Sequence, residues 1–151
     1  MLRYFAYGSN MLRARIEARL GPVEVVGAAK LPDYAHAFDK YGFDGTAKGN
    51  INPAPGDVVH GVLYQITPPQ LTQLATFEGG YRRIDIRVTC GHLEHLALSF
   101  QAIDPMRDPT SRPPPSPEYL DYYWRGMREH DLPAHYQAQL RAQAGLAAAP
   151  R

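Results

Sequence analysis

The chain has 151 residues, of which 44% are hydrophobic and 21% are charged. This composition is typical of one folded domain with a hydrophobic core, and it excludes a disordered chain. The formal net charge of +1 argues against a dedicated nucleic-acid surface. The single cysteine, Cys90, cannot form an internal disulfide, so a reducing cytoplasm is the expected setting. No apolar run has the length of a membrane span or the pattern of a signal core, so we expect no membrane partner.

The first predicted unit is a strand, a tight turn and a helix. Apolar alternation indicates a strand over residues 2–7, followed by a turn at residues 8–10. A helix is expected from about Met11 until Gly21-Pro22, with Ser9 or Asn10 as its N-cap. Its apolar stripe repeats every four residues and consists of Leu12, Ile16 and Leu20.

The middle of the chain predicts two strands, a loop and a short helix. Residues 23–30 and 58–66 have strand character. Residues 39–56 are rich in Gly, Asp and Asn and are predicted to form a loop. A helix should begin after Thr67 and end at Gly79-Gly80.

The remaining elements complete a mixed pattern. Alternation predicts strands around residues 84–89 and 96–100, and a Pro-rich loop follows over residues 104–117. Helices are expected to begin at Ser116-Pro117 and at Asp131. Because strands and helices do not alternate as regular βαβ units, the predicted fold class is α+β.

We expect a single domain over residues 1–151, with a tail that frays from about residue 145. The Tyr-rich helix and the Ala-rich tail are compatible with a homodimer, but neither pattern decides the oligomeric state.

The turn Tyr7-Gly8-Ser9-Asn10 is the first candidate for chemistry. A turn between a strand and a helix exposes free backbone N–H groups at the positive end of the helix dipole, where an anion or an oxyanion binds well. Gly8 allows a ligand to approach closely and allows an unusual φ. The same pattern is also typical of an ordinary helix cap with a Gly turn, and the pattern alone leaves both interpretations open.

Glu78 is the second candidate. It is predicted to share the apolar face of a helix with Leu71, Leu74 and Ala75, where a carboxylate is rare unless it is paired or functional. Burial and the helix C-terminus would both raise its pKa, which suits a residue that accepts and returns a proton near neutral pH. The alternatives are an ion pair with Arg82 or Arg83, and a side chain that bends into solvent.

Other catalytic patterns are weak or absent. Cys90, His92 and His95 lie close together but match no zinc signature, so we expect no metal. The sequence has no Gly-x-Ser-x-Gly, no Walker A loop and no GxGxxG, and we expect no cofactor.

Five segments, in order, resemble motifs of the γ-glutamyl cyclotransferase family, and together they span most of the chain. The first resembles the family's FAYGSN signature, the second its PGD strand, the third its EG motif, and the last two its PPSPxY loop and GLPxxY turn. The segments are residues 4–12 (YFAYGSNML), 55–64 (PGDVVHGVLY), 74–81 (LATFEGGY), 114–119 (PPSPEY) and 131–136 (DLPAHY).

The resemblance implies a small mixed β-barrel flanked by helices. It implies an enzyme that needs no metal and releases 5-oxoproline when the α-amine of a γ-glutamyl amide attacks its own γ-carbonyl. The acid/base glutamate falls on Glu78, and Tyr7, Gly8, Ser9 and Asn10 bind the glutamyl moiety. Tyr81 and Tyr119 match the family's two further binding tyrosines.

Two departures from the family pattern leave the leaving-group amine open. The segment between Glu78 and Tyr81 is short, and Phe100 stands where some relatives carry a tyrosine. The alternatives are an enzyme acting on a γ-glutamylated lysine or natural product, and a non-catalytic module that binds a small metabolite or a partner. Arg82 and Arg83 favour an acidic leaving group, although solvated strand-end charges are the more common case.

Overall fold

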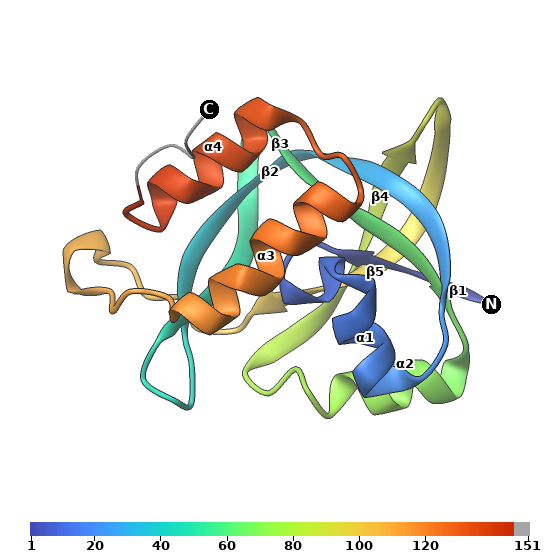
Figure 1. Ribbon diagram of the computed structural model, residues 1–151, viewed down its shortest axis with the longest axis horizontal. Helices are drawn as coiled ribbons and strands as arrows, with labels where there is room; N and C mark the ends of the chain where they lie inside the picture. The colour runs from blue at the N-terminus through green and yellow to red at the C-terminus, as the bar shows by residue number, and fades with distance from the viewer. Residues whose placement is uncertain (147–151) are drawn as a thin grey trace.

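The computed structural model describes residues 1–146, so the tail beyond residue 146 lies outside the described part of the chain. Five strands form a closed barrel in the order β1-β3-β2-β4-β5 (Figure 1). The strands are Leu2–Ala6 (β1), Glu24–Tyr41 (β2), Ala47–Ile66 (β3), Tyr81–Cys90 (β4) and Leu93–Ala102 (β5).

The barrel is mixed, as predicted. β1 is parallel to β5 at Tyr4 and Leu98, and every other neighbouring pair is antiparallel. β2 and β3 are long and pair along most of their length, with register shifts near Gly27, Tyr34 and Lys40. Such irregularities bend a strand and increase its twist, which allows a small sheet to close on itself.

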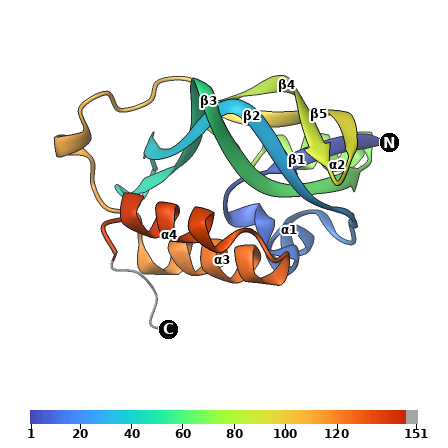
Figure 2. The same cartoon turned by 90° about the horizontal axis from the view of Figure 1, so that it is seen from above.

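Four helices flank the barrel, and α1, α3 and α4 lie together on one side of it (Figure 2). Their apolar faces pack on the barrel, so the predicted fold class of α+β with a flanked mixed barrel is confirmed. The helices are Arg13–Leu20 (α1), Pro68–Ala75 (α2), Pro117–Glu129 (α3) and Ala134–Gln143 (α4), with short 3₁₀ helices at Ser9–Met11 and Pro109–Ser111.

Two of the predicted helix starts are confirmed by their caps. Thr67 and Gln70 form a reciprocal capping box at the start of α2. Ser116 caps α3 by accepting from the N–H of Tyr119.

The predicted loop over residues 39–56 is wrong, because this segment forms the ends of β2 and β3 and the hairpin between them. Its Gly and Asn residues are loop formers in general, but here Gly42, Gly49 and Asn50 are buried. Asn50 is fully buried, and its amide oxygen accepts from the N–H of Ala102 on β5. The polar side chain therefore completes strand pairing instead of ending the strand.

Three helix boundaries also differ from the prediction, one of them the start of α4, which lies at Ala134 instead of Asp131. α1 begins at Arg13, and the side chains of Ser9 and Asn10 cap no helix, since both are buried and contact arginines instead. α2 ends at Ala75, before Gly79, because a turn stabilised by backbone bonds follows it.

The core has two parts that meet at β1. Tyr4 points into a cluster between the barrel and the helices, which includes Ile16 of α1 and Tyr123 of α3. Phe5, the next residue, points into a second cluster inside the barrel with Leu63. Because alternate side chains of β1 pack into these two clusters, both faces of the strand are held in place directly before the turn at residues 8–10.

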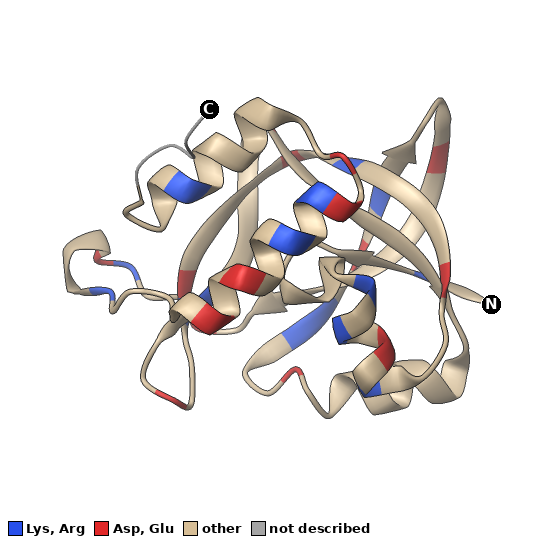
Figure 3. Cartoon of the chain, viewed as in Figure 1, with Lys and Arg blue, Asp and Glu red and all other residues tan. Residues whose placement is uncertain are grey.

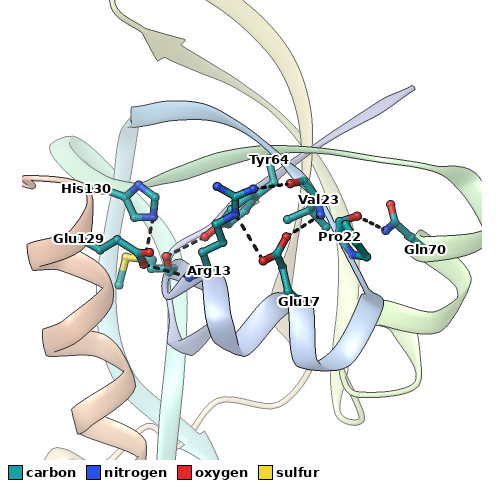
Figure 4. A network of polar contacts seen from close by, with 9 residues as sticks. Arg13, Glu17, Pro22, Val23, Tyr64, Gln70, Glu129 and His130 are labelled. Atoms are coloured by element: carbon teal, nitrogen blue, oxygen red, sulfur yellow. Dashed lines mark hydrogen bonds and ion pairs between the residues drawn. The ribbon is translucent and has the colours of Figure 1, made fainter.

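A polar network holds the first turn of α1 in place (Figure 4). The N–H of Arg13 donates to the Glu129 carboxylate on α3 at 3.0 Å, and the Tyr64 hydroxyl donates to the carbonyl of Met11 at 2.7 Å. Since Met11 follows directly on the turn at residues 8–10, these bonds fix the position of that turn. The far end of α1 is tied to β2 and α2 through Glu17, Pro22, Val23 and Gln70.

Charges of both signs lie on the visible helices, and α1 and α3 each carry basic and acidic residues (Figure 3). Over residues 1–146, no helix is both long enough and apolar enough to cross a membrane.

Candidate active site

A cavity of about 200 Å³ opens between the turn at residues 8–10, the β2–β3 hairpin and the segment after α2. All seven residues that were predicted for the site line this one cavity, although they come from three separate segments of the chain. They are Tyr7, Gly8, Ser9, Asn10, Glu78, Tyr81 and Tyr119.

The turn between β1 and α1 supplies free backbone donors. In residues 1–146, the N–H groups of Gly8, Ser9 and Asn10 have no intramolecular acceptor, and all three residues line the cavity. Gly8 has φ −119°, so it does not adopt the unusual φ that was considered for it. It is needed for close approach instead, because a Cβ there would lie 3.2 Å from the hydroxyl oxygen of Tyr123.

The side chains of the same turn hold two arginines of α1 at the cavity wall. Arg15 donates to the hydroxyl oxygen of Ser9 at 3.3 Å, and Arg19 donates to the amide oxygen of Asn10 at 3.3 Å. Both guanidinium groups also lie over aromatic rings, Arg15 over Tyr122 and Arg19 over Phe77. These contacts place two cations beside the free amides.

Glu78 lies in the turn between α2 and β4. Its N–H donates to the carbonyl of Ala75, and its carbonyl accepts from the N–H of Tyr81. The predicted apolar helical face therefore ends at Leu74, since Ala75 is exposed and Glu78 follows the helix instead of lying on it.

Burial raises the pKa of the Glu78 carboxyl to about 7, and the positive charges of Arg19 and Lys40 limit the rise. The carboxyl has no hydrogen bond or ion pair with another side chain among residues 1–146. The alternative ion pairs are absent there, because Arg82 bonds to Gln101 and Arg83 pairs with Asp85. The cavity thus holds a carboxyl that is free to exchange a proton near neutral pH.

The hydroxyl groups of Tyr7 and Tyr81 both donate their protons to backbone carbonyls. Tyr7 donates to the carbonyl of Phe100 at 2.6 Å, and Tyr81 donates to the carbonyl of Gly49 at 2.7 Å. Burial raises the pKa of both hydroxyls, so they stay protonated. Each therefore presents only an acceptor oxygen to a ligand.

Four basic residues of the cavity were missed as site residues by sequence reasoning. Arg15 and Arg19 were assigned to the polar face of a helix, and Lys40 and Lys48 belong to the segment predicted as a loop. Lys48 lies over the ring of Tyr119 and pairs with Asp44 at 3.1 Å. The spacing of Arg15 and Arg19, one turn apart directly after the turn at residues 8–10, was the only signal available.

The cysteine and histidines considered for a metal do not form a site. Cys90 ends β4, His92 lies in the turn, and His95 is on β5. Within the described residues, no group of three or more potential ligands is placed to hold a metal ion.

The fold and cavity define a small closed-barrel protein with a buried carboxyl of raised pKa in the same cavity as a loop of free amides. The family described as "Gamma-glutamyl cyclotransferase, AIG2-like" matches residues 4–121. The chain belongs to this family, and the predicted resemblance is confirmed.

Curated relatives and solved structures agree with this assignment. The chain is 31% identical to bovine gamma-glutamylcyclotransferase over 150 residues, covering 91% of this chain and 76% of the relative. It is 28% identical to the mouse protein of the same name, covering 92% and 77%. A solved structure called gamma-glutamyl cyclotransferase matches with a TM-score of 0.84 and 28% identity, over 93% of this chain and 86% of the other.

Proposed function

We propose that this chain is a γ-glutamyl cyclotransferase, which converts a γ-glutamyl amide to 5-oxoproline and a free amine with Glu78 as the acid/base residue. Membership of the family and the names of its curated relatives support this activity. The role of Glu78 rests on one observation. Its carboxyl lies in the cavity without a partner among the described residues, and burial raises its pKa to about 7.

The polarity of the cavity fits a γ-glutamyl group. The free amides of Gly8, Ser9 and Asn10 are donors, which suit the α-carboxylate of the substrate. The oxygens of Tyr7 and Tyr81 are acceptors, which suit its α-ammonium. Donors and acceptors within one cavity would fold the flexible substrate so that its amine faces its own γ-carbonyl, and such proximity is worth up to about 10 kcal/mol.

The proposed reaction moves two protons from the attacking nitrogen to the leaving nitrogen, because the attacking nitrogen begins as an ammonium and ends as a lactam N–H. Ionised Glu78 takes the first proton from the α-ammonium, and the amine nitrogen then forms a bond to the γ-carbonyl carbon. As the tetrahedral intermediate collapses, Glu78 gives this proton to the leaving nitrogen, and the bond from that carbon to the leaving nitrogen breaks. Glu78 then takes the second proton from the ring nitrogen and passes it to the released amine, which leaves as an ammonium, so atoms and charges balance and the carboxylate is restored.

The charge of the cavity favours a leaving amine that carries a carboxylate. Lys40 and Lys48, on the two strands of the β2–β3 hairpin, also line the cavity, and among the described residues Lys48 pairs with Asp44 whereas Lys40 has no ion pair. A leaving group without a carboxylate, such as a lysine side chain whose nitrogen is the amide nitrogen, would gain no attraction from Lys40. We therefore propose γ-glutamyl amino acids as the preferred substrates over γ-glutamylated lysine side chains or uncharged amines.

The test is 5-oxoproline release from γ-glutamyl amino acids, glutathione, a γ-glutamylated lysine side chain and an uncharged γ-glutamyl amine. The variant Glu78→Gln should lose at least about a hundredfold in turnover while it stays folded, with a melting temperature no lower than that of the parent. Glu24→Gln, at an exposed position of β2, is the matched control and should retain activity. Turnover that survives Glu78→Gln would remove this residue from its role. No turnover by the parent chain on any substrate would favour the non-catalytic binding module instead.

A further inference from the structure

A buried histidine lies behind the cavity wall. His36 on β2 is 4% exposed, and both of its ring nitrogens have partners. Nδ1 lies 2.8 Å from the amide oxygen of Gln143 on α4, and Nε2 lies 2.9 Å from the hydroxyl of Tyr123 on α3. Burial lowers the pKa of His36 to about 4, so the ring is neutral near pH 7 and carries one N–H.

The contacts with Gln143 decide which nitrogen carries that proton. The Gln143 amide nitrogen donates to the backbone carbonyl of His36 at 2.9 Å. A carbonyl only accepts, so this bond fixes the orientation of the amide and directs its oxygen at Nδ1. Nδ1 must therefore carry the proton, and Nε2 must accept the proton of the Tyr123 hydroxyl.

The direction of the His36 hydrogen bonds also fixes the proton of Tyr119 at the cavity. Tyr123 has a single proton, which it gives to His36, so in the 3.5 Å contact between the Tyr123 and Tyr119 hydroxyls the donor is Tyr119. The Tyr119 oxygen also accepts from the N–H of Gly49 at 2.9 Å. The proton of Tyr119 is thus turned away from the cavity, and its remaining lone pair is available to a ligand.

We infer that His36 and Gln143 are positioning residues, which keep the Tyr119 hydroxyl an acceptor so that its oxygen joins those of Tyr7 and Tyr81 around the substrate's α-ammonium. This inference rests on the proposed function. The opposite histidine tautomer would reverse the direction of these hydrogen bonds. Tyr123 would then donate to Tyr119, and the Tyr119 proton would face the ammonium. Gln143 and Tyr123 lie beyond the stretch that matches the family, residues 4–121.

Substitutions at Gln143 separate polarity from mere packing. Gln143→Lys offers only donors, to Nδ1 and to the His36 carbonyl, so it should force the reversed tautomer. Gln143→Glu offers an acceptor to Nδ1–H and should keep the original one. Both variants lose the amide pair, so a purely structural role predicts similar effects. Gln139→Lys, an exposed position one turn earlier on α4, is the matched control for the added charge.

The first measurement is the ¹⁵N chemical shifts of the His36 ring in the parent chain, which report the tautomer without turnover. We expect the proton on Nδ1. A ring protonated at Nε2 would overturn the proposed role of His36 and Gln143 and leave the proposed enzymatic function untouched. The second is steady-state kinetics with a γ-glutamyl amino acid. We expect Gln143→Lys to raise KM about tenfold with a smaller change in kcat, while Gln143→Glu and Gln139→Lys stay within about twofold of the parent.

Equal effects of Gln143→Lys and Gln143→Glu, at unchanged melting temperature, would overturn the positioning role. Absence of turnover by the parent chain would overturn the proposed function, and the role toward the ammonium with it, whatever tautomer is found.

Discussion

Removal of the positive charge at Lys40 is expected to move the pH dependence of the enzyme. Lys40 lines the cavity with Glu78 and holds the pKa of that carboxyl below the value that burial alone would give. A single charge that is partly screened by solvent contributes on the order of 1 kcal/mol, or about 0.7 pH unit. The variant Lys40→Met should therefore raise the pKa of Glu78 by roughly that amount.

The assay is kcat/KM for 5-oxoproline release as a function of pH. Its acid limb reports the free enzyme's Glu78, because the carboxyl must be ionised before it removes a proton from the ammonium. In the parent chain the limb should lie near the Glu78 pKa of about 7. In Lys40→Met it should lie higher, whatever the change in the height of the profile.

A matched control excludes a general effect of charge. Lys30 lies on the same strand as Lys40 but is exposed, and it is not among the charges that act on Glu78. Lys30→Met should leave the acid limb in place. An unchanged or lowered limb in Lys40→Met would refute the electrostatic reasoning, and equal shifts in both variants would show that the net charge of the protein is responsible.

Two further predictions concern stability. Because the pKa of Glu78 is raised from 4.5 to about 7 on folding, the folded chain binds more protons than the unfolded chain between these values, and stability falls as pH rises through this window. Urea unfolding of Glu78→Gln should therefore show a gain over the parent that is larger at about pH 8 than at about pH 4, by on the order of 3 kcal/mol; an equal difference at both would contradict the raised pKa. Gly49→Ala should destabilise by more than about 2 kcal/mol, since the new Cβ would overlap the Tyr123 hydroxyl, and a melting temperature equal to that of the parent would contradict this packing.

The sequence predicted those parts of the site that lie in contiguous motifs. The turn at residues 8–10 and the turn around Glu78 are local structures, so their residue types carry the signal directly. Their meeting in one cavity followed from the family resemblance and not from periodicity. Alternation in a strand does not say which distant segment lies beside it.

The β2–β3 hairpin could not be predicted because several of its residues are buried in strands, although their types usually prefer loops. Gly49 leaves room for Tyr123, and Asn50 bonds to β5, so the roles of both residues depend on α3 and the barrel and not on local sequence. Local propensity favours a loop for these residues. Because Lys40 and Lys48 lie in the same segment, they were not predicted to line the site. Conflicts between local preference and the fold are expected where a site is built.

The same cations that fit the proposed substrate also set the chemistry of Glu78. Without Arg19 and Lys40, burial would raise the pKa of the carboxyl further above neutrality and leave less of it ionised at pH 7. With a carboxyl more open to water, the pKa would fall toward its ordinary value, and the residue would be a weaker base. The burial of Glu78 and the presence of Arg19 and Lys40 in the same cavity therefore act on its pKa in opposite directions, and the acid limb of Lys40→Met measures the contribution of one of these cations directly.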